Sequence, residues 1–111
     1  MKISEICQAL GAQVAVPGDG ERDVTKATAG DLLSFVMGNA PEGAAWITIQ
    51  AHLNAAAVAV LKDLPLVIIA AGRKAPDDLV ERCKKENICL AAVKTTIFQT
   101  CAVLAQLGLE E

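Results

Sequence analysis

The chain has 111 residues, with 10 basic and 13 acidic side chains and a formal net charge of −3. This length fits one domain with a substantial core, and the acidic balance provides no strong field for nucleic acid. Apolar residues make up 53% of the chain, which argues against disorder. The only aromatic residues are Phe35, Trp46 and Phe98, so the base-stacking surface of a single-strand nucleic-acid binder is not expected.

Neither a signal peptide nor a membrane span is expected. Residues 1–5 lack a basic region followed by a continuous apolar stretch. The most hydrophobic region, 53–71, is interrupted by Asn54, Asp63 and Pro65, which is typical of a helix followed by a buried strand. We therefore expect a cytoplasmic protein that does not bind a membrane.

Four cysteines occur, and no two of them form a C-x-x-C pair: Cys7, Cys83, Cys89 and Cys101. Zinc and iron–sulfur sites usually take two ligands from one tight turn. No cofactor is therefore predicted, and an iron–sulfur cluster is not expected. We expect four reduced, mostly buried thiols and no structural disulfide in a cytoplasmic chain.

The first part of the chain predicts a helix and two strands. Apolar residues recur at helical spacing over 3–10, and Gly11 stands where a glycine would end that helix. A short strand is predicted over 13–16, followed by the turn signal Pro-Gly-Asp-Gly at 17–20. A second strand is predicted over 23–28.

A second helix is predicted by the apolar stripe within 32–37, and 38–39 can end it. Either Thr28 or Asp31 is placed to cap its first turn. Asp31 and Ser34 both fall near the start of this helix. A capping role is one interpretation of these two side chains, and contact with a polar ligand is the other.

Strands and helices alternate over the rest of the chain. Strands are predicted over 45–49, 66–70 and 88–93, and helices over 54–61, 76–87 and 96–107. Short connections and right-handed crossovers make such strands parallel, and helices must then cover both faces of the sheet. The predicted fold class is α/β, as a single three-layer α/β/α domain over 1–111 with a mostly parallel sheet.

Ligands of open parallel sheets gather beyond the carboxyl ends of the strands. That rule selects the segments 48–54, 70–74 and 94–96, which carry three cations, Arg73, Lys74 and Lys94. The candidate ligand-binding residues in these segments are Thr48, Gln50, His52, Asn54, Gly72, Arg73, Thr95 and Thr96. Such an edge suits a small anion or a nucleotide phosphate, because helix N-termini there add backbone N–H donors.

Each of these residues also has a structural interpretation. His52, the only histidine, can bind a ligand or act as a base, and it can equally cap a helix. Asn54 can be an N-cap. Arg73 can be a solvated loop side chain, and Thr95 and Thr96 can form a cap.

The motifs of common enzymes are absent. The chain has no G-x-x-x-x-G-K-[ST] phosphate loop, no G-x-G-x-x-G dinucleotide loop after a strand and no G-x-S-x-G elbow. The roles of nucleophile, base and oxyanion donor cannot be filled from named residues. No catalytic residue is predicted, and we do not expect an enzyme.

Three segments together resemble the DRTGG domain family. Residues 24–34 have the pattern V-T-x-x-x-x-x-D-L-L-S, and residues 46–50 have the pattern W-I-T-x-Q. An apolar strand ending in glycine follows, here 66–72. The resemblance to the stand-alone members covers nearly the whole chain, although the D-R-T-G-G string itself does not occur.

The family is similar to the N-terminal domain of HPr kinase/phosphorylase, and the module also occurs in some phosphotransacetylases and between the CBS domains of some pyrophosphatases. The resemblance implies a regulatory or protein-interaction module without catalytic residues, often self-associating. A homodimer that acts on a partner enzyme or signalling protein is the leading hypothesis, with an anion or nucleotide sensed at the strand ends. The alternatives are an accessory protein of an iron–sulfur or hydrogenase system, since some relatives carry such names, and a monomeric ligand sensor.

Overall fold

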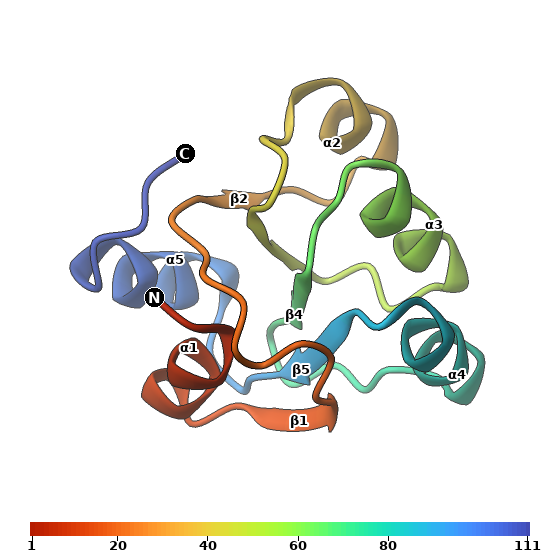
Figure 1. Cartoon of the computed structure of the whole chain (residues 1–111), viewed down its shortest axis with the longest axis horizontal. Coiled ribbons are helices and arrows are strands. Elements are labelled where there is room, and N and C mark those ends of the chain that lie inside the picture. Colours follow the sequence, from red (N-terminus) through yellow and green to blue (C-terminus); the bar gives the residue numbers. More distant parts are fainter.

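The computed structural model describes residues 1–111 and contains five helices and five strands (Figure 1). In chain order they are α1 (Ile3–Leu10), β1 (Gln13–Val16), β2 (Ala27–Ala29), α2 (Leu33–Asn39), β3 (Ala45–Thr48), α3 (Leu53–Leu61), β4 (Leu66–Ile69), α4 (Asp77–Glu86), β5 (Cys89–Ala92) and α5 (Ile97–Gln106). None of these helices is both long and apolar enough to cross a membrane.

The strands form one sheet in the order β1-β5-β4-β3-β2. Strands β2 to β5 are parallel, and β1 pairs antiparallel with β5, with Gln13 opposite Ala92. The central strands β3 and β4 are buried along their whole length, as expected for parallel strands covered on both faces. The mostly parallel sheet predicted from the sequence is confirmed.

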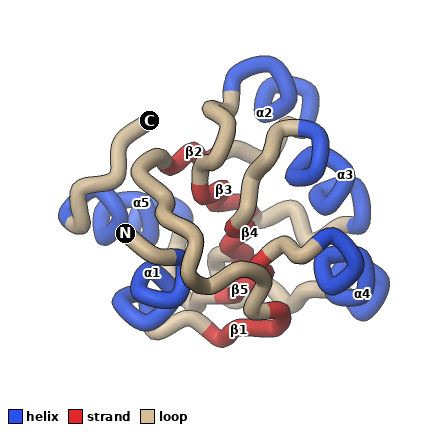
Figure 2. The backbone as a smooth tube through the Cα atoms, viewed as in Figure 1, coloured by secondary structure: helices blue, strands red, loops and turns tan.

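Helices cover both faces of the sheet and complete three layers. Helices α2, α3 and α4 pack on one face around Trp46, and α1 and α5 pack on the other around Ile47 and Ile68. Figure 2 shows the strands in a row between these two groups of helices. The two apolar clusters contain 16 and 14 buried residues, so the core is divided about equally between the faces.

One predicted strand is shorter and later than expected. The sequence predicts a strand over 23–28, whereas β2 covers only Ala27–Ala29. The residues before β2 are hydrogen-bonded to the two ends of the chain. The Val24 N–H donates to the Met1 carbonyl, and the Glu110 N–H donates to the Thr25 carbonyl. Hydrogen bonds to both termini thus take the place of most pairing with β3 in this segment, although the Lys26 carbonyl accepts from the Ala45 N–H of β3.

The predicted caps of α2 are wrong. Leu32 occupies the N-cap position without a side-chain hydrogen bond. The Thr28 hydroxyl donates to the Glu111 carboxylate over 2.9 Å, and Asp31 faces the end of β3. By contrast, the predicted capping box of α5 is present, since Thr96 accepts from the Gln99 N–H and the Gln99 side chain accepts from the Thr96 N–H.

Candidate functional site

The carboxyl ends of β2, β3, β4 and β5 lie along one edge of the sheet, since these strands are parallel. The antiparallel strand β1 begins at the same edge, because Gln13 pairs with the last residue of β5. The structure divides the predicted site residues among three places on this edge: the ends of β2 and β3, the start of α3, and the loops after β4 and β5.

At the ends of β2 and β3, three predicted ligand residues are bound to one another. Asp31 Oδ1 accepts hydrogen bonds from the Thr48 hydroxyl and the Ile49 N–H, each over 2.8 Å. Thr48 Oγ1 accepts from the Gln50 N–H, and the Gln50 amide donates to the Asp31 carbonyl. We call these contacts the Asp31–Thr48–Gln50 network, and the 0% exposure of Thr48 closes its centre to solvent.

Trp46 makes a further hydrogen bond to the turn that carries Asp31. Its ring is fully buried in the core, and Nε1–H donates to the Gly30 carbonyl over 2.9 Å. A buried indole usually finds such a partner. The tryptophan, threonine and glutamine of the W-I-T-x-Q segment therefore fasten the turn between β2 and α2 to the end of β3.

At the start of α3, His52 is the N-cap and Asn54 is not. His52 Nδ1 accepts a hydrogen bond from the Asn54 N–H over 3.0 Å, which satisfies one of the free donors of the first turn. Both side chains are exposed, as is Ser34 on α2. None of the three lines the pocket that the structure forms at this edge.

The loops after β4 and β5 are tied together. The Ala71 N–H donates to the Thr95 carbonyl over 2.7 Å, and the Gly72 N–H donates to the Val93 carbonyl over 3.0 Å. Ala71 and Gly72 have φ values of +62° and +71°, a left-handed conformation that is uncommon for alanine. These bonds fix the backbone that leads into Arg73.

The threonines after β5 are satisfied mainly by local contacts. The Thr95 and Thr100 hydroxyls lie 2.8 Å apart, and Thr100 is buried. Thr96 caps α5. Of these side chains only Thr95 also lines the pocket.

A pocket of about 690 Å³ lies between β1, the carboxyl-end half of β5 and the start of α4. We call it the β1–β5–α4 pocket. Of the predicted site residues, it is lined by Gly72, Arg73 and Thr95. Its charged side chains are Arg73, Lys74, Lys94 and Asp77. The lining thus contains three cations and one carboxylate, in a chain whose net charge is −3.

Sequence reasoning missed Gln13, Val14 and Asp77 as lining residues of this pocket. No local pattern indicates that β1 pairs antiparallel with β5, and this pairing brings Gln13 and Val14 there. The sequence pattern explains Asp77 only as a favourable charge at the start of a helix. A signal for Asp77 was its position three residues after Lys74, beyond the carboxyl end of β4.

The chain contains no group of three or more His, Cys, Asp or Glu side chains placed to hold a metal ion. All four cysteines are free, and three of them are buried. Burial raises the pKa of the Cys83 thiol to about 11, so this thiol stays protonated at neutral pH.

No family model matches the chain, and no curated protein matches it. Among solved structures it is similar to the CBS and DRTGG domains of the regulatory region of a Clostridium perfringens pyrophosphatase, complexed with the activator diadenosine tetraphosphate. The similarity has a TM-score of 0.75 at 18% sequence identity, and it covers 95% of this chain and 46% of that chain. This chain thus spans less than half of that chain and shares the fold of the part that it matches.

Proposed function

We propose that this chain is a non-catalytic regulatory module that senses a small anionic ligand, such as a nucleotide, in the β1–β5–α4 pocket. The observation that carries the proposal is the gathering of Arg73, Lys74 and Lys94 around one pocket of a net-acidic chain. As part of the same proposal, the protein is cytoplasmic and is a stand-alone member of the DRTGG family, as predicted from the sequence.

The cations suit phosphate groups for different reasons. A guanidinium such as that of Arg73 can donate two parallel hydrogen bonds to one phosphate. The ammonium groups of Lys74 and Lys94 act as mobile point charges on flexible stems. Because all three side chains are exposed, salt screens their attraction for an anion. The Asp77 carboxylate repels an anion, so it favours ligands whose negative charge lies near the cations and away from Asp77.

The rest of the pocket suits an apolar or aromatic group. Val14, Val80 and Leu90 contribute aliphatic surface to its lining, and small-molecule sites usually combine such surface with a few placed polar groups. The Thr95 hydroxyl at the rim adds a donor or acceptor. A nucleotide provides both features, with a base for the aliphatic wall and phosphates for the cations.

The fixed loop backbone supports this assignment. The hydrogen bonds from Ala71 and Gly72 to the segment after β5 hold Arg73 and Lys94 on neighbouring loops. Loops fixed before the ligand arrives lower the ordering cost of binding. The same bonds use up the N–H groups of Ala71 and Gly72, so side chains rather than these amides would contact the ligand.

A thermal-shift panel tests the proposal. The panel contains pyrophosphate, nucleoside mono-, di- and triphosphates, and diadenosine tetraphosphate. The last is included because the regulatory region that this chain matches in part is complexed with it. A ligand at about 100 times its dissociation constant adds about 2.7 kcal/mol to the free energy of unfolding, a rise in Tm of several degrees. A Tm unchanged by every anion at millimolar concentration would contradict the proposal.

Self-association with a second copy is proposed from a separate observation. Leu32 and Phe35, at and near the start of α2, are 68% and 60% exposed. Exposed large apolar side chains that lie close together mark interaction surfaces more often than scattered ones do. In this proposal ligand binding changes the dimer, and the dimer in turn regulates a partner enzyme or signalling protein.

A further inference from the structure

We propose that Cys7 and Cys89 are a modification site, at which a peroxide joins α1 to β5 through a reversible disulfide. The pair lies in the core cluster packed by α1 and α5, whereas the β1–β5–α4 pocket is lined by the start of α4, and the proposal stands independently of the proposed function. The thiols are free in the resting chain.

The two sulfur atoms are in contact across the fold. Cys7 Sγ lies 3.9 Å from Cys89 Sγ, although the residues are 82 positions apart in the sequence. Cys7 is in the last turns of α1, and Cys89 is the first residue of β5. A disulfide has an S–S length of about 2.05 Å, so the two sulfur atoms must approach each other by about 1.9 Å to form the bond.

A surface pocket leads to both sulfurs. Cys7 and Cys89 are only 5% and 1% exposed, yet both line a pocket of about 490 Å³. The pocket is bounded by Ser4 and Gln8 on α1 and by Pro17 and Gly20 in the turn after β1. A molecule of the size of hydrogen peroxide can therefore approach the pair without unfolding of the core.

The environments of the two thiols divide the chemical roles between them. The hydrogen bond between the two thiols lowers the pKa of Cys7, against the effect of burial. That bond and burial raise the pKa of Cys89. Cys7 is also the more accessible of the two, at 5% exposure against 1% for Cys89. Because the thiolate is the reactive form and the peroxide reaches Cys7 first, Cys7 is the attacking sulfur and Cys89 is the sulfur that resolves the intermediate.

The reaction balances with hydrogen peroxide as the oxidant. The Cys7 thiolate attacks one peroxide oxygen, the O–O bond breaks, and the products are a sulfenic acid and, after proton uptake, water. The Cys89 sulfur then attacks the sulfenic sulfur, the S–O bond breaks, and a second water leaves. Two thiols lose two electrons in total, and one peroxide gains them.

The other two cysteines are controls, because neither is paired with a second thiol. Cys83 lies in the opposite core cluster, on α4, and Cys101 lies on α5. Neither has another cysteine as a hydrogen-bond partner. A variant with C83A and C101A keeps only the pair, and a variant with C7A and C89A keeps only the unpaired thiols.

The experiment treats both variants and the unchanged chain with hydrogen peroxide and counts thiols by maleimide labelling and mass spectrometry after denaturation. We expect the pair-only variant to lose both thiols together, to become lighter by two hydrogen atoms without forming a disulfide-linked dimer, and to regain both thiols with dithiothreitol. The C7A/C89A variant should form no intramolecular link. Peptide mapping of the unchanged chain should identify the Cys7–Cys89 link, which keeps the test valid if a variant fails to fold.

Two results would overturn the proposal. One is an unchanged chain that keeps Cys7 and Cys89 reduced while Cys101 is oxidised. The other is oxidation of the pair only to sulfinic acid or to links between chains.

Discussion

The Asp31 carboxylate lies 2.8 Å from the Thr48 hydroxyl, and this contact connects the turn after β2 to the end of β3. Both residues belong to the segments that resemble the DRTGG family, and both are candidates for ligand binding on the sequence alone. In the structure their polar groups are hydrogen-bonded to each other and to Gln50. The network holds the strand ends in place beside α2.

Replacing Thr48 tests the network. Thr48→Val removes a buried donor to Asp31 and the acceptor of the Gln50 N–H, so the free energy of unfolding should fall by about 1–3 kcal/mol. Thr48→Ser keeps the hydroxyl and loses one methyl group, for a smaller loss of about 1 kcal/mol. Urea unfolding measures both. A valine variant as stable as the serine variant would show that the hydroxyl is not needed.

Replacing Gly18 tests the close approach between the turn after β1 and β5. Gly18 has a φ of +56°, and an added Cβ would lie 2.5 Å from the Cys89 backbone nitrogen. Gly11 has a similar φ of +61° but open space around the added atom. Gly11→Ala should therefore cost about 1 kcal/mol from backbone conformation alone, and Gly18→Ala should cost considerably more. Equal losses of stability in urea would contradict the close approach of Gly18 to the Cys89 backbone.

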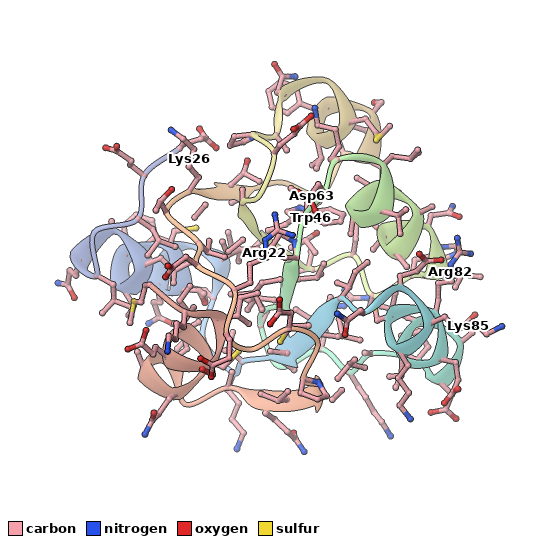
Figure 3. All side chains as sticks on the ribbon, in the orientation of Figure 1. Arg22, Lys26, Trp46, Asp63, Arg82 and Lys85 are labelled. Carbon is pink, nitrogen blue, oxygen red and sulfur yellow. The ribbon has the colours of Figure 1, made fainter.

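The ion pair between Arg22 and Asp63 predicts a pH dependence. Two guanidinium nitrogens donate to the two Asp63 oxygens over 3.0 and 2.7 Å, and Figure 3 shows the two side chains side by side. Hydrogen bonding to Arg22 lowers the pKa of Asp63 in the folded chain. The stabilisation is therefore complete above the ordinary aspartate pKa of about 3.9 and is lost as the pH falls through the folded-state value.

Asp63→Asn should cost about 0.2–1 kcal/mol at pH 7, because the pair is exposed. The difference from the unchanged chain should shrink as urea unfolding is repeated at lower pH, from 5 towards 2.5. Glu42→Gln, at an exposed residue without an ion pair, is the matched control. A difference that stays constant, or grows, as the pH falls would contradict the assigned direction.

The proposed second copy is tested at α2. Phe35→Glu should convert a dimer to a monomer, because it places a charge on the exposed apolar surface of α2. Phe98→Glu is the matched control, since Phe98 is 83% exposed but lies on α5 across the sheet. Light scattering after size exclusion measures the mass of each chain. An unchanged chain that is monomeric at high micromolar concentration would exclude this dimer.

Much of the fold follows from local patterns in the sequence. The buried strand β4 and the capping box of α5 are predictable because continuous apolar runs and paired cap residues are local signals. The cap at His52 is one of two interpretations of that residue, and only the position of its Nδ1 near the Asn54 N–H distinguishes them. The shortening of β2 depends on hydrogen bonds to Met1 and Glu110, which no local pattern reveals.

The candidate site is predicted less completely, because its parts come from distant segments. The sheet-edge rule identifies Arg73 and Thr95, and the structure places both on one pocket. The rule does not distinguish a side chain that faces solvent from one that faces a neighbouring strand end. It therefore groups Thr48 and Gln50 with Arg73, although hydrogen bonds to Asp31 occupy them.

The most direct test of the central claim is calorimetric titration of the nucleotide that gives the largest rise in Tm, with Arg73→Ala/Lys94→Ala compared with Lys85→Ala. Lys85 is a similarly exposed cation on α4 that does not line the pocket (Figure 3). We expect the double variant to bind at least about tenfold more weakly, a loss of about 1.4 kcal/mol, and Lys85→Ala to bind as the unchanged chain does. Equal weakening per removed charge in the two variants would show that net charge, not the β1–β5–α4 pocket, governs binding. Undiminished binding by the double variant would place the ligand elsewhere.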